Sequence, residues 1–214
     1  MKKVIIFANG SLGNSKYYLN LIDKNDLIIC VNGGTKHAFN LHLTPYVVIG
    51  DLDSLTPKNN KWLFNKGIKL IKYPKEKDKT DLELALDFTA KNNFKEVYIL
   101  GAFGTRIDHS LANLLMAIQK KYQTLNIFFI YNNQKIFLIK NENVIKGKRG
   151  DLVSLIPLLG DCLVDKITGL KYKLNNETLF FGATRGVSNV FIKNEVLIKI
   201  KKGLLLAIHN EKKD

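Results

Sequence analysis

The chain has 214 residues and is 46% hydrophobic, so it can bury a sizeable core and is not an intrinsically disordered protein. No apolar run exceeds five residues, which is too short for an export signal or for a membrane helix of roughly 20 residues, so we expect a cytoplasmic protein with no membrane partner. The formal charge of +14 comes from lysines spread over the whole chain, so we expect no nucleic-acid partner either.

In the first part of the chain, short β-branched runs alternate with longer amphipathic ones, which is typical of a parallel sheet covered by helices. The predicted strands span residues 3–8, 27–31, 46–49, 68–72, 97–100 and 126–131. The predicted helices span residues 35–41, 57–66, 80–92 and 108–122. The pattern predicts an α/β fold with an N-terminal parallel-sheet, Rossmann-like domain over residues 1–132.

From residue 133 onward, short alternating runs are broken by Gly, Asn and Asp. The predicted strands span residues 151–157, 169–174, 189–193, 196–201 and 204–209. We therefore predict a smaller all-β domain, a sandwich or barrel, over residues 133–214. Cys30 and Cys162 have apolar neighbours and no Cys or His at metal-ligand spacing, so both are predicted to be small buried hydrophobes.

Residues 50–54 (Gly-Asp-Leu-Asp-Ser) follow a predicted strand directly. Ligands of open α/β sheets bind beyond the carboxyl ends of the strands, so Asp51 and Asp53 are expected to face that crevice. Residues two apart in extended chain point the same way, which would bring both carboxylates to one side. Paired carboxylates repel unless a cation intervenes, and their oxygens suit Mg²⁺. The alternative is a solvated turn in which Asp51 or Ser54 caps the next helix.

Two further helix starts carry acids. Thr80 and Glu83 have the spacing of a capping box, and Asp78 and Asp81 lie where the helix dipole favours negative charge, so a purely structural interpretation stays open there. Residues 101–109 (Gly-Ala-Phe-Gly-Thr-Arg-Ile-Asp-His) follow another predicted strand.

Gly101 and Gly104 permit close backbone approach, and the helix N-terminus offers free amides to anionic oxygens. Arg106 could grip phosphate while Asp108 joins the metal cluster or orients a nucleophile. His109 has either a buried hydrogen-bonding role or a ligand contact. Acids, metal and arginine together favour phosphoryl-type transfer.

Four motifs in order resemble the signatures of the thiamine pyrophosphokinase family: residues 50–54, 77–81, 104–109 and 185–189 (Arg-Gly-Val-Ser-Asn). The resemblance covers nearly the whole chain, including its α/β and then all-β layout. It implies transfer of the pyrophosphoryl group of ATP to the hydroxyl of thiamine, giving thiamine diphosphate and AMP, with Mg²⁺ as cofactor. Among the departures, Asn32 stands where the family often has Asp before Gly-Gly.

The resemblance also implies residue roles. Residues 1–132 would be the catalytic domain that binds ATP and magnesium, and residues 133–214 the thiamine-binding domain of a homodimer. The implied metal ligands are Asp51, Asp53, Asp81 and Asp108. The implied catalytic residues are Asp53, Asp81, Arg106 and Asp108. The implied ATP-binding residues are Asp51, Asp78, Thr80, Gly101, Gly104, Arg106 and His109. The implied thiamine-binding residues are Asp81, Arg185, Ser188 and Asn189. Asp81 and Asp108 both stay open as the general base.

Two other functions compete with this interpretation. Asp51-Leu52-Asp53 after a strand also resembles the opening motif of aspartate-nucleophile phosphatases, although there it normally follows the first strand and here it follows the third. The charge alone would favour a basic nucleotide- or RNA-binding module.

Overall fold

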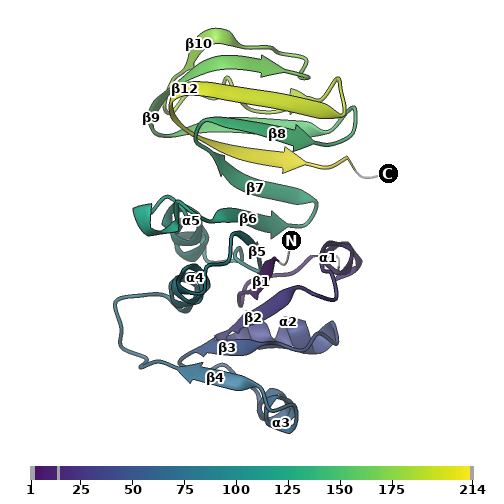
Figure 1. Ribbon diagram of the computed structural model, residues 1–214, viewed down its shortest axis with the longest axis vertical. Helices are drawn as coiled ribbons and strands as arrows, with labels where there is room; N and C mark the ends of the chain where they lie inside the picture. Colours follow the sequence, from purple (N-terminus) through teal and green to yellow (C-terminus); the bar gives the residue numbers. More distant parts are fainter. Residues whose placement is uncertain (1–2, 14, 213–214) are drawn as a thin grey trace. The chain divides into compact units, whose positions relative to one another are not determined.

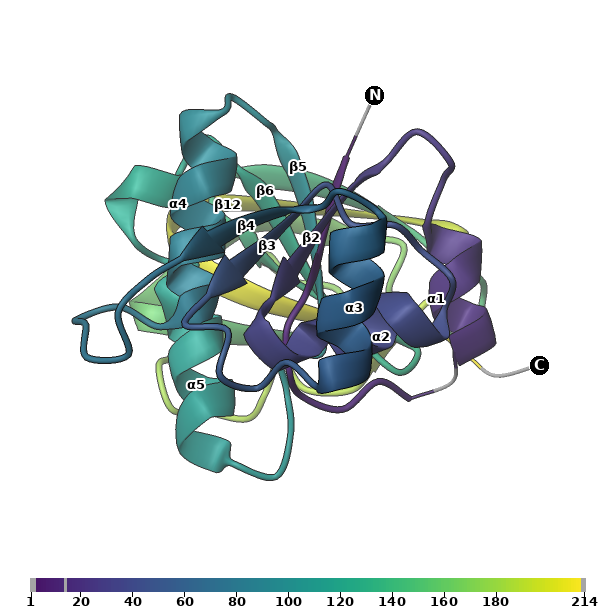
Figure 2. The ribbon, with the colours of Figure 1, turned by 90° about the horizontal axis from the view of Figure 1, so that it is seen from below.

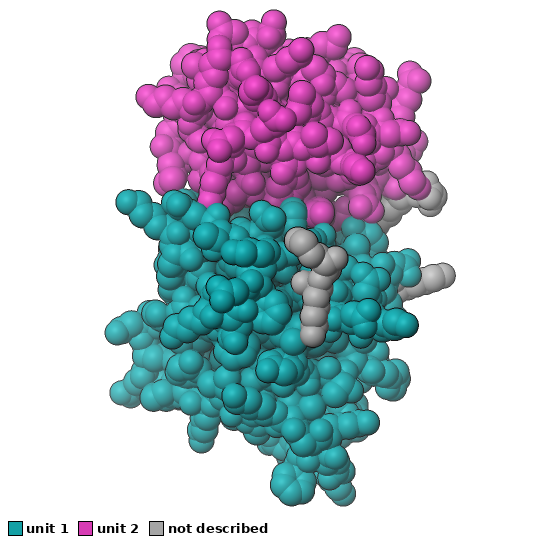
Figure 3. Space-filling view, viewed as in Figure 1, with its two compact units in different colours: residues 1–132 teal, residues 133–214 magenta. Residues whose placement is uncertain are grey.

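The computed structural model describes residues 3–13 and 15–212, except for the side chains of residues 15 and 16. The chain divides into two compact units, residues 1–132 (unit 1) and residues 133–214 (unit 2), which are coloured separately in Figure 3. Within the described ranges, no helix is long and apolar enough to cross a membrane.

Unit 1 is built on a parallel sheet (Figure 1). Its strands are β1 (Val4–Phe7), β2 (Leu27–Val31), β3 (Val47–Gly50), β4 (Lys69–Lys72), β5 (Glu96–Leu100) and β6 (Asn126–Tyr131). They lie in the order β6-β5-β1-β2-β3-β4, and every neighbouring pair is parallel. The chain runs outward from β1 to β4 and then returns to the other side of β1 with β5. The strand order therefore reverses between β1 and β5, the position at which open α/β sheets bind ligands.

Helices cover both faces of this sheet. They are α1 (Ser15–Leu21), α2 (Thr35–Asn40), α3 (Pro57–Asn65), α4 (Asp81–Lys91) and α5 (Ile107–Met116), with 3₁₀ turns η1 (Asn32–Gly34) and η2 (Lys120–Tyr122). Figure 2 shows α1, α2 and α3 on one side of the strands and α4 and α5 on the other. Ile5 and Phe7 pack with Tyr18 of α1 and Leu63 of α3 in one buried cluster. Because both faces are covered, the central strands are apolar along their whole length.

The predicted helices and strands of unit 1 are confirmed, with two differences. Helix α1 was not predicted, because its seven residues have no acidic first turn or basic last turn to mark them. It is held by tertiary contacts instead, since the Tyr18 hydroxyl accepts the backbone N–H groups of Gly13 and Asn132 at 3.2 and 3.0 Å. Helix α5 ends at Met116 and not at residue 122, because Tyr122 sits in η2, where its hydroxyl donates to Asp87 at 2.8 Å.

Unit 2 consists of antiparallel strands. They are β7 (Gln134–Ile139), β8 (Glu142–Lys146), β9 (Leu152–Thr168), β10 (Asn175–Leu179), β11 (Asn189–Val190) and β12 (Glu195–Asn210). Strands β9 and β12 pair along most of their length, while β8 pairs with the first part of β12 and β7 with its last part. The register of β9 against β12 shifts between Lys199 and Leu204, and Leu159, Gly160 and Gly203 have positive φ. Such irregularities bend and twist a strand. The predicted fold class, α/β followed by all-β, is confirmed.

Strand boundaries were predicted less well in unit 2. Residues 134–146 form two strands that were not predicted, and residues 196–201 and 204–209 belong to one strand, because the bulge around Gly203 lets the ladder continue. Residues 169–174 are not a strand and contribute only the isolated bridge of Leu170 with Phe191. Cys30 and Cys162 are both buried, as predicted.

Candidate active site

A cavity of about 550 Å³ opens at the carboxyl edge of the unit 1 sheet. The loops after β1, β2 and β5 line it, together with the segment between β4 and α4 and the first turns of α4 and α5. Its basic lining residues are Lys75, Lys77, Lys79, Arg106 and His109. The size suits a small ligand, and the positive lining favours an anionic one.

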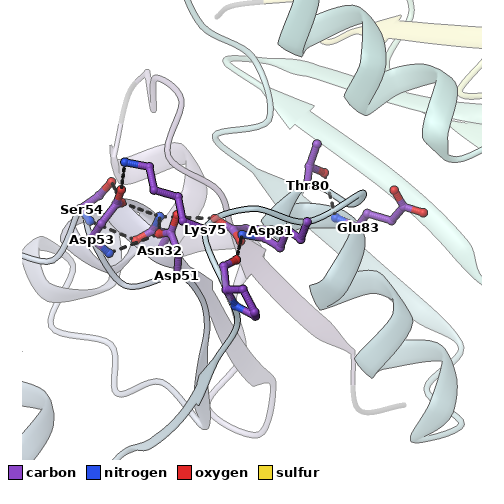
Figure 4. A network of polar contacts seen from close by, with 10 residues as sticks. Asn32, Asp51, Asp53, Ser54, Lys75, Thr80, Asp81 and Glu83 are labelled. Carbon is purple, nitrogen blue, oxygen red and sulfur yellow. Dashed lines mark hydrogen bonds and ion pairs between the residues drawn. The ribbon is translucent and has the colours of Figure 1, made fainter.

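Asn32, directly after β2, lies at the centre of the acidic groups beside this cavity (Figure 4). Its amide nitrogen donates to Asp51 Oδ1 at 2.7 Å, to Asp53 Oδ1 at 3.3 Å and to Asp81 Oδ2 at 3.3 Å. Its Oδ1 accepts the backbone N–H of Ser54 at 3.3 Å. Asp51, Asp53 and Asp81, hereafter the acid cluster, therefore converge on one nitrogen atom from two separate segments of the chain.

The local backbone explains how Asp51 and Asp53 meet. Extended chain was predicted here, but the segment is a turn. Leu52 between the two acids has φ 65°, and the Asp53 N–H donates to Asp51 Oδ1 at 3.2 Å. Gly50 begins the turn with φ 148°, and a Cβ there would lie 3.2 Å from Asp81 Oδ2. Glycine at this position thus permits both the turn and the approach of α4 to β3.

Two lysines offset part of the negative charge of the acid cluster. Lys75 Nζ lies 3.6 Å from Asp53 Oδ2, and Lys77 Nζ lies 3.1 Å from Asp81 Oδ1. Hydrogen bonds from Ser54 and then from Asn32 lower the pKa of Asp53, which keeps this carboxylate ionised. Asp81 Oδ1 is buried and has the Lys77 ammonium nearby but accepts no hydrogen bond.

These residues suit a hard divalent cation by their donor chemistry. In the present arrangement, no group of three or more His, Cys, Asp or Glu side chains in the described part of the chain is close enough to hold a metal ion. The three carboxylates nevertheless surround one point, and a buried oxygen of Asp81 accepts no hydrogen bond although the Lys77 ammonium lies 3.1 Å from it. Carboxylate oxygens are the ligands that Mg²⁺ prefers. The residues of the acid cluster therefore fit the predicted cation.

Asp108 forms an ion pair with Arg106. Its carboxylate accepts Arg106 Nη2 at 2.6 Å and Nε at 3.3 Å, and both side chains are more than 60% exposed. The hydrogen bond from Arg106 lowers the pKa of Asp108. The guanidinium fork of Arg106, which was predicted to grip phosphate, is thus held by a carboxylate two residues away, although Arg106 still lines the cavity.

The loop after β5 passes close to the loop after β1. Gly10 N–H donates to the Gly101 carbonyl at 2.8 Å, and Gly101 has φ 69°. A Cβ on Gly101 would lie 2.5 Å from the Ala8 carbonyl oxygen, so this position requires glycine. A Cβ on Gly104 would make only ordinary contacts of 3.6 Å or more, so crowding within the fold does not explain that glycine.

The other predicted ATP-binding residues differ in whether they line the cavity. Thr80 is the N-cap of α4 and accepts the Glu83 N–H at 3.2 Å, but the Glu83 carboxylate pairs with Lys121, so the capping box is only half formed. His109 is exposed and lines the cavity, which argues against a buried hydrogen-bonding role. Asp78 is exposed on the loop before α4 and does not line the cavity.

The three predicted thiamine-binding residues of unit 2 lie before and at β11. Arg185 pairs with Glu177, and Ser188, with φ 58°, donates its backbone N–H to Ser154 Oγ at 3.0 Å. Asn189 is buried, donates to the Tyr172 carbonyl at 2.6 Å and accepts the Tyr172 N–H at 3.0 Å. Its side chain is therefore engaged in holding the loop that carries Tyr172.

Sequence reasoning assigned no role to Asn32, Lys75 or Lys77. Asn32 had two available signals, since it follows an apolar strand and precedes two glycines. The alternate spacing of Lys75, Lys77 and Lys79 was a weaker signal. These lysines pair with Asp53, Asp81 and Asp87 respectively, and no local pattern specifies such partners.

Comparisons with known proteins agree with one another. The family model for the thiamin pyrophosphokinase catalytic domain matches residues 18–129, and the model for the thiamin pyrophosphokinase vitamin B1 binding domain matches residues 138–205. Thiamine pyrophosphokinase of Bacillus subtilis is 29% identical and is aligned over 98% of this chain and 99% of its own length. Thiamine pyrophosphokinase 1 of rice (Oryza sativa subsp. japonica) is 23% identical, over 88% and 80% respectively.

The fold is also that of a solved structure. The crystal structure of the Bacillus subtilis protein superposes with a TM-score of 0.89 at 27% identity, covering 99% of this chain and 100% of the other.

Proposed function

The chain belongs to the thiamin pyrophosphokinase family, and from this premise we propose that it transfers the pyrophosphoryl group of ATP to thiamine, giving thiamine diphosphate and AMP. The observation that carries the proposal is the acid cluster gathered on Asn32 beside a cavity lined with lysines. Carboxylates for a cation and ammonium groups for phosphate oxygens are what transfer from a nucleoside triphosphate requires.

The transfer forms one bond and breaks one bond. The thiamine hydroxyl oxygen attacks the β-phosphorus of ATP, and the bond from that phosphorus to the oxygen bridging the α- and β-phosphates breaks. AMP leaves with the bridging oxygen, and the hydroxyl proton passes to a carboxylate, for which Asp81 and Asp108 are the candidates. Asp81 is the better placed of the two, because it belongs to the acid cluster whereas Asp108 pairs with Arg106.

The remaining roles follow from position. Asp51, Asp53 and Asp81 would hold Mg²⁺, which when bound supplies charge neutralisation for the triphosphate. Lys75 and Lys77 would turn from the acid cluster toward phosphate oxygens, and the backbone between Gly101 and Arg106 would cradle the chain of phosphates. Arg106 would exchange Asp108 for phosphate, which its fork geometry permits.

Unit 2 is proposed to bind thiamine in a homodimer. The match of residues 138–205 to a vitamin B1 binding domain supports the first part of this proposal. Because the Asn189 amide is engaged with Tyr172, we assign side-chain contacts with thiamine to Arg185 and Ser188, and to Asn189 the support of the loop. Sedimentation of the purified protein at twice the monomer mass would support the homodimer, and sedimentation as a monomer with both substrates present would refute it.

The test of the reaction is direct. Purified protein is mixed with MgCl₂ and ATP, with and without thiamine, and the nucleotides are separated. AMP that appears only with thiamine, together with an equal amount of thiamine diphosphate, is the expected result. ADP would indicate an ordinary kinase or ATPase and would contradict the proposal. The phosphatase alternative has no support in the family matches, and Asp51 follows the third strand of the structure.

A further inference from the structure

The backbone that carries the Asn32 side chain is fixed by its neighbours. Asn32 is only 9% exposed and has φ 46°, a conformation uncommon outside glycine. Its carbonyl accepts the Thr35 hydroxyl at 2.8 Å. Behind it, a Cβ on Gly34 would lie 2.1 Å from the Phe7 carbonyl oxygen, so η1 is packed against β1. The amide of Asn32 is therefore presented to the acid cluster from a firmly packed backbone.

The hydrogen bonds of this amide do not neutralise the negative charge of the three carboxylates around it. An amide NH₂ group has two N–H donors, and here three carboxylate oxygens lie within 3.3 Å of the nitrogen. The amide is neutral, so it reduces the repulsion among the carboxylates only through its dipole. Lys75 and Lys77 contribute two positive charges against three negative ones. The acid cluster is thus gathered but not neutralised.

We propose that Asn32 is a positioning residue that keeps the acid cluster assembled by placing its amide where a divalent cation would otherwise hold the three carboxylates. This inference rests on the proposed role of the cluster as the cation site. A cation that binds the carboxylates must displace the N–H groups of Asn32, so the asparagine lowers the affinity for the cation while keeping its ligands in place. Asn32 therefore sets how strongly the site depends on the cation.

Two substitutions separate this role from a purely structural one. Asn32→Ala removes the donor and leaves three carboxylates in mutual repulsion. Asn32→Asp adds a fourth carboxylate at the same point. Both variants should melt at a lower temperature than wild type in EDTA. MgCl₂ should raise the melting temperature of each variant by more than it raises that of wild type, and the rise should be greatest for Asn32→Asp.

The measurement is the melting temperature without nucleotide, in EDTA and in MgCl₂, for wild type and both variants. NaCl at matched ionic strength serves as the control for simple screening. Asn113→Asp is the matched control variant, because Asn113 lines the same cavity but donates to the Ala102 carbonyl at 2.7 Å instead of to the cluster. The MgCl₂ shift of each protein is the difference between its own melting temperatures in MgCl₂ and in EDTA. We expect the MgCl₂ shift of Asn32→Asp to exceed that of wild type by at least about 3 °C, with Asn32→Ala in between and Asn113→Asp like wild type.

Equal MgCl₂ shifts in all proteins, or a smaller shift in Asn32→Ala than in wild type, would overturn the inference. Should Asn32→Asp not fold, the comparison of Asn32→Ala with wild type decides the matter by the same criterion. The proposed function is tested separately by AMP formation in the wild type. A wild type that makes thiamine diphosphate while the shifts are equal removes only the role of Asn32, whereas a wild type that makes none removes the proposed function whatever the shifts.

Discussion

Each unit contains a buried or half-buried acidic site, and the two sites differ in how completely their oxygens are bonded. In unit 2, Asp151 is buried and accepts the backbone N–H groups of Lys148 and Lys212 at 2.8 and 2.9 Å, and His209 Nε2 lies 2.9 Å from Oδ2. Although burial opposes ionisation, these contacts lower the pKa of Asp151. Phe191 stacks on the His209 ring with centroids 5.0 Å apart. Both oxygens of Asp151 therefore have hydrogen-bond partners, and we call Asp151 with these partners the closed acid site.

The acid cluster of unit 1, hereafter the open acid site, is bonded less completely. Three carboxylates share the single amide of Asn32, and Lys75 lies 3.6 Å from Asp53. One buried oxygen of Asp81 has an ion pair with Lys77 at 3.1 Å but accepts no hydrogen bond. Buried polar groups are normally satisfied, so an exception next to a cavity indicates a place reserved for a ligand. In this protein, the acids beside the cavity have oxygens with incomplete hydrogen bonding, whereas both oxygens of Asp151 are hydrogen-bonded.

The largest expected effect comes from the open site. Asp53→Ala removes a carboxylate that is 48% exposed at its side chain, so the fold should be retained while turnover falls about 1,000-fold, or roughly 4 kcal/mol in the barrier. Steady-state rates of thiamine diphosphate formation test this, with Asp23→Ala as the control because Asp23 pairs with Lys3 outside the cavity. Normal turnover in Asp53→Ala would remove Asp53 from the site.

The closed site should behave in the reverse manner. Asp151→Ala leaves His209 and two backbone N–H groups without their acceptor, so the free energy of unfolding should fall by about 3 kcal/mol. Turnover per folded molecule should be unchanged. Urea unfolding together with the rate assay checks both statements. A variant that keeps full stability but loses turnover would show that Asp151 takes part in the reaction and is not a structural acid.

A smaller effect is expected at the edge of the open site. Arg106→Lys keeps the charge and loses the fork, so kcat/KM for ATP should fall about tenfold, roughly 1.4 kcal/mol, with stability unchanged. The control is Arg149→Lys, since Arg149 is exposed in unit 2. If both variants retain the wild-type kcat/KM, Arg106 is a surface residue whose partner is only Asp108.

The smallest expected effect concerns Asp87 in helix α4. Asp87 is bonded by Lys79, Lys121 and Tyr122, and although desolvation opposes them, these contacts lower its pKa to about 2. Because the folded pKa lies below the unfolded value near 3.9, the stabilisation is present above about pH 4 and is lost as pH falls toward 2.

The variant Asp87→Asn should therefore lose about 1 kcal/mol of unfolding free energy at pH 7. The difference from wild type should be constant between pH 7 and 5 and should narrow below pH 4. Denaturant titrations at each pH would show this, and a difference that grows on acidification would contradict the assigned pKa.

Most strands of the unit 1 sheet could be predicted because their own residues form a continuous apolar run, whereas the edge strand β4 has a lysine at each end and is mostly exposed. Buried parallel strands are continuous apolar runs, and Asp51, Asp53 and Asp81 follow such a run or begin a helix, where a pattern can find them. Asn32 escaped because its importance lies in three partners that are 19, 21 and 49 residues away. From its position at a helix start, Asp108 was predicted either to join the metal cluster or to orient a nucleophile. Its bond to Arg106 depends on rotamers that no spacing specifies.

Unit 2 was harder to predict because its long strands are shared. Strand β12 pairs with β8 in its first part, with β7 in its last part and with β9 along most of its length. Its burial pattern therefore changes along the strand, and in the sequence Gly203 indicates the end of one strand. Alternation within one segment cannot reveal that its neighbours continue the ladder.

The open acid site of unit 1 is proposed to perform pyrophosphoryl transfer, and the closed acid site of unit 2 is proposed to take no part in it. The most direct measurement uses ATP labelled at the β-phosphorus, with thiamine and MgCl₂, for wild type, Asp53→Ala and Asp151→Ala at equal folded concentration. We predict that the label appears in thiamine diphosphate, with an equal amount of unlabelled AMP, for wild type and Asp151→Ala, and appears about 1,000-fold more slowly for Asp53→Ala. Label that stays in ADP, or that reaches thiamine diphosphate equally well in Asp53→Ala, would contradict the account.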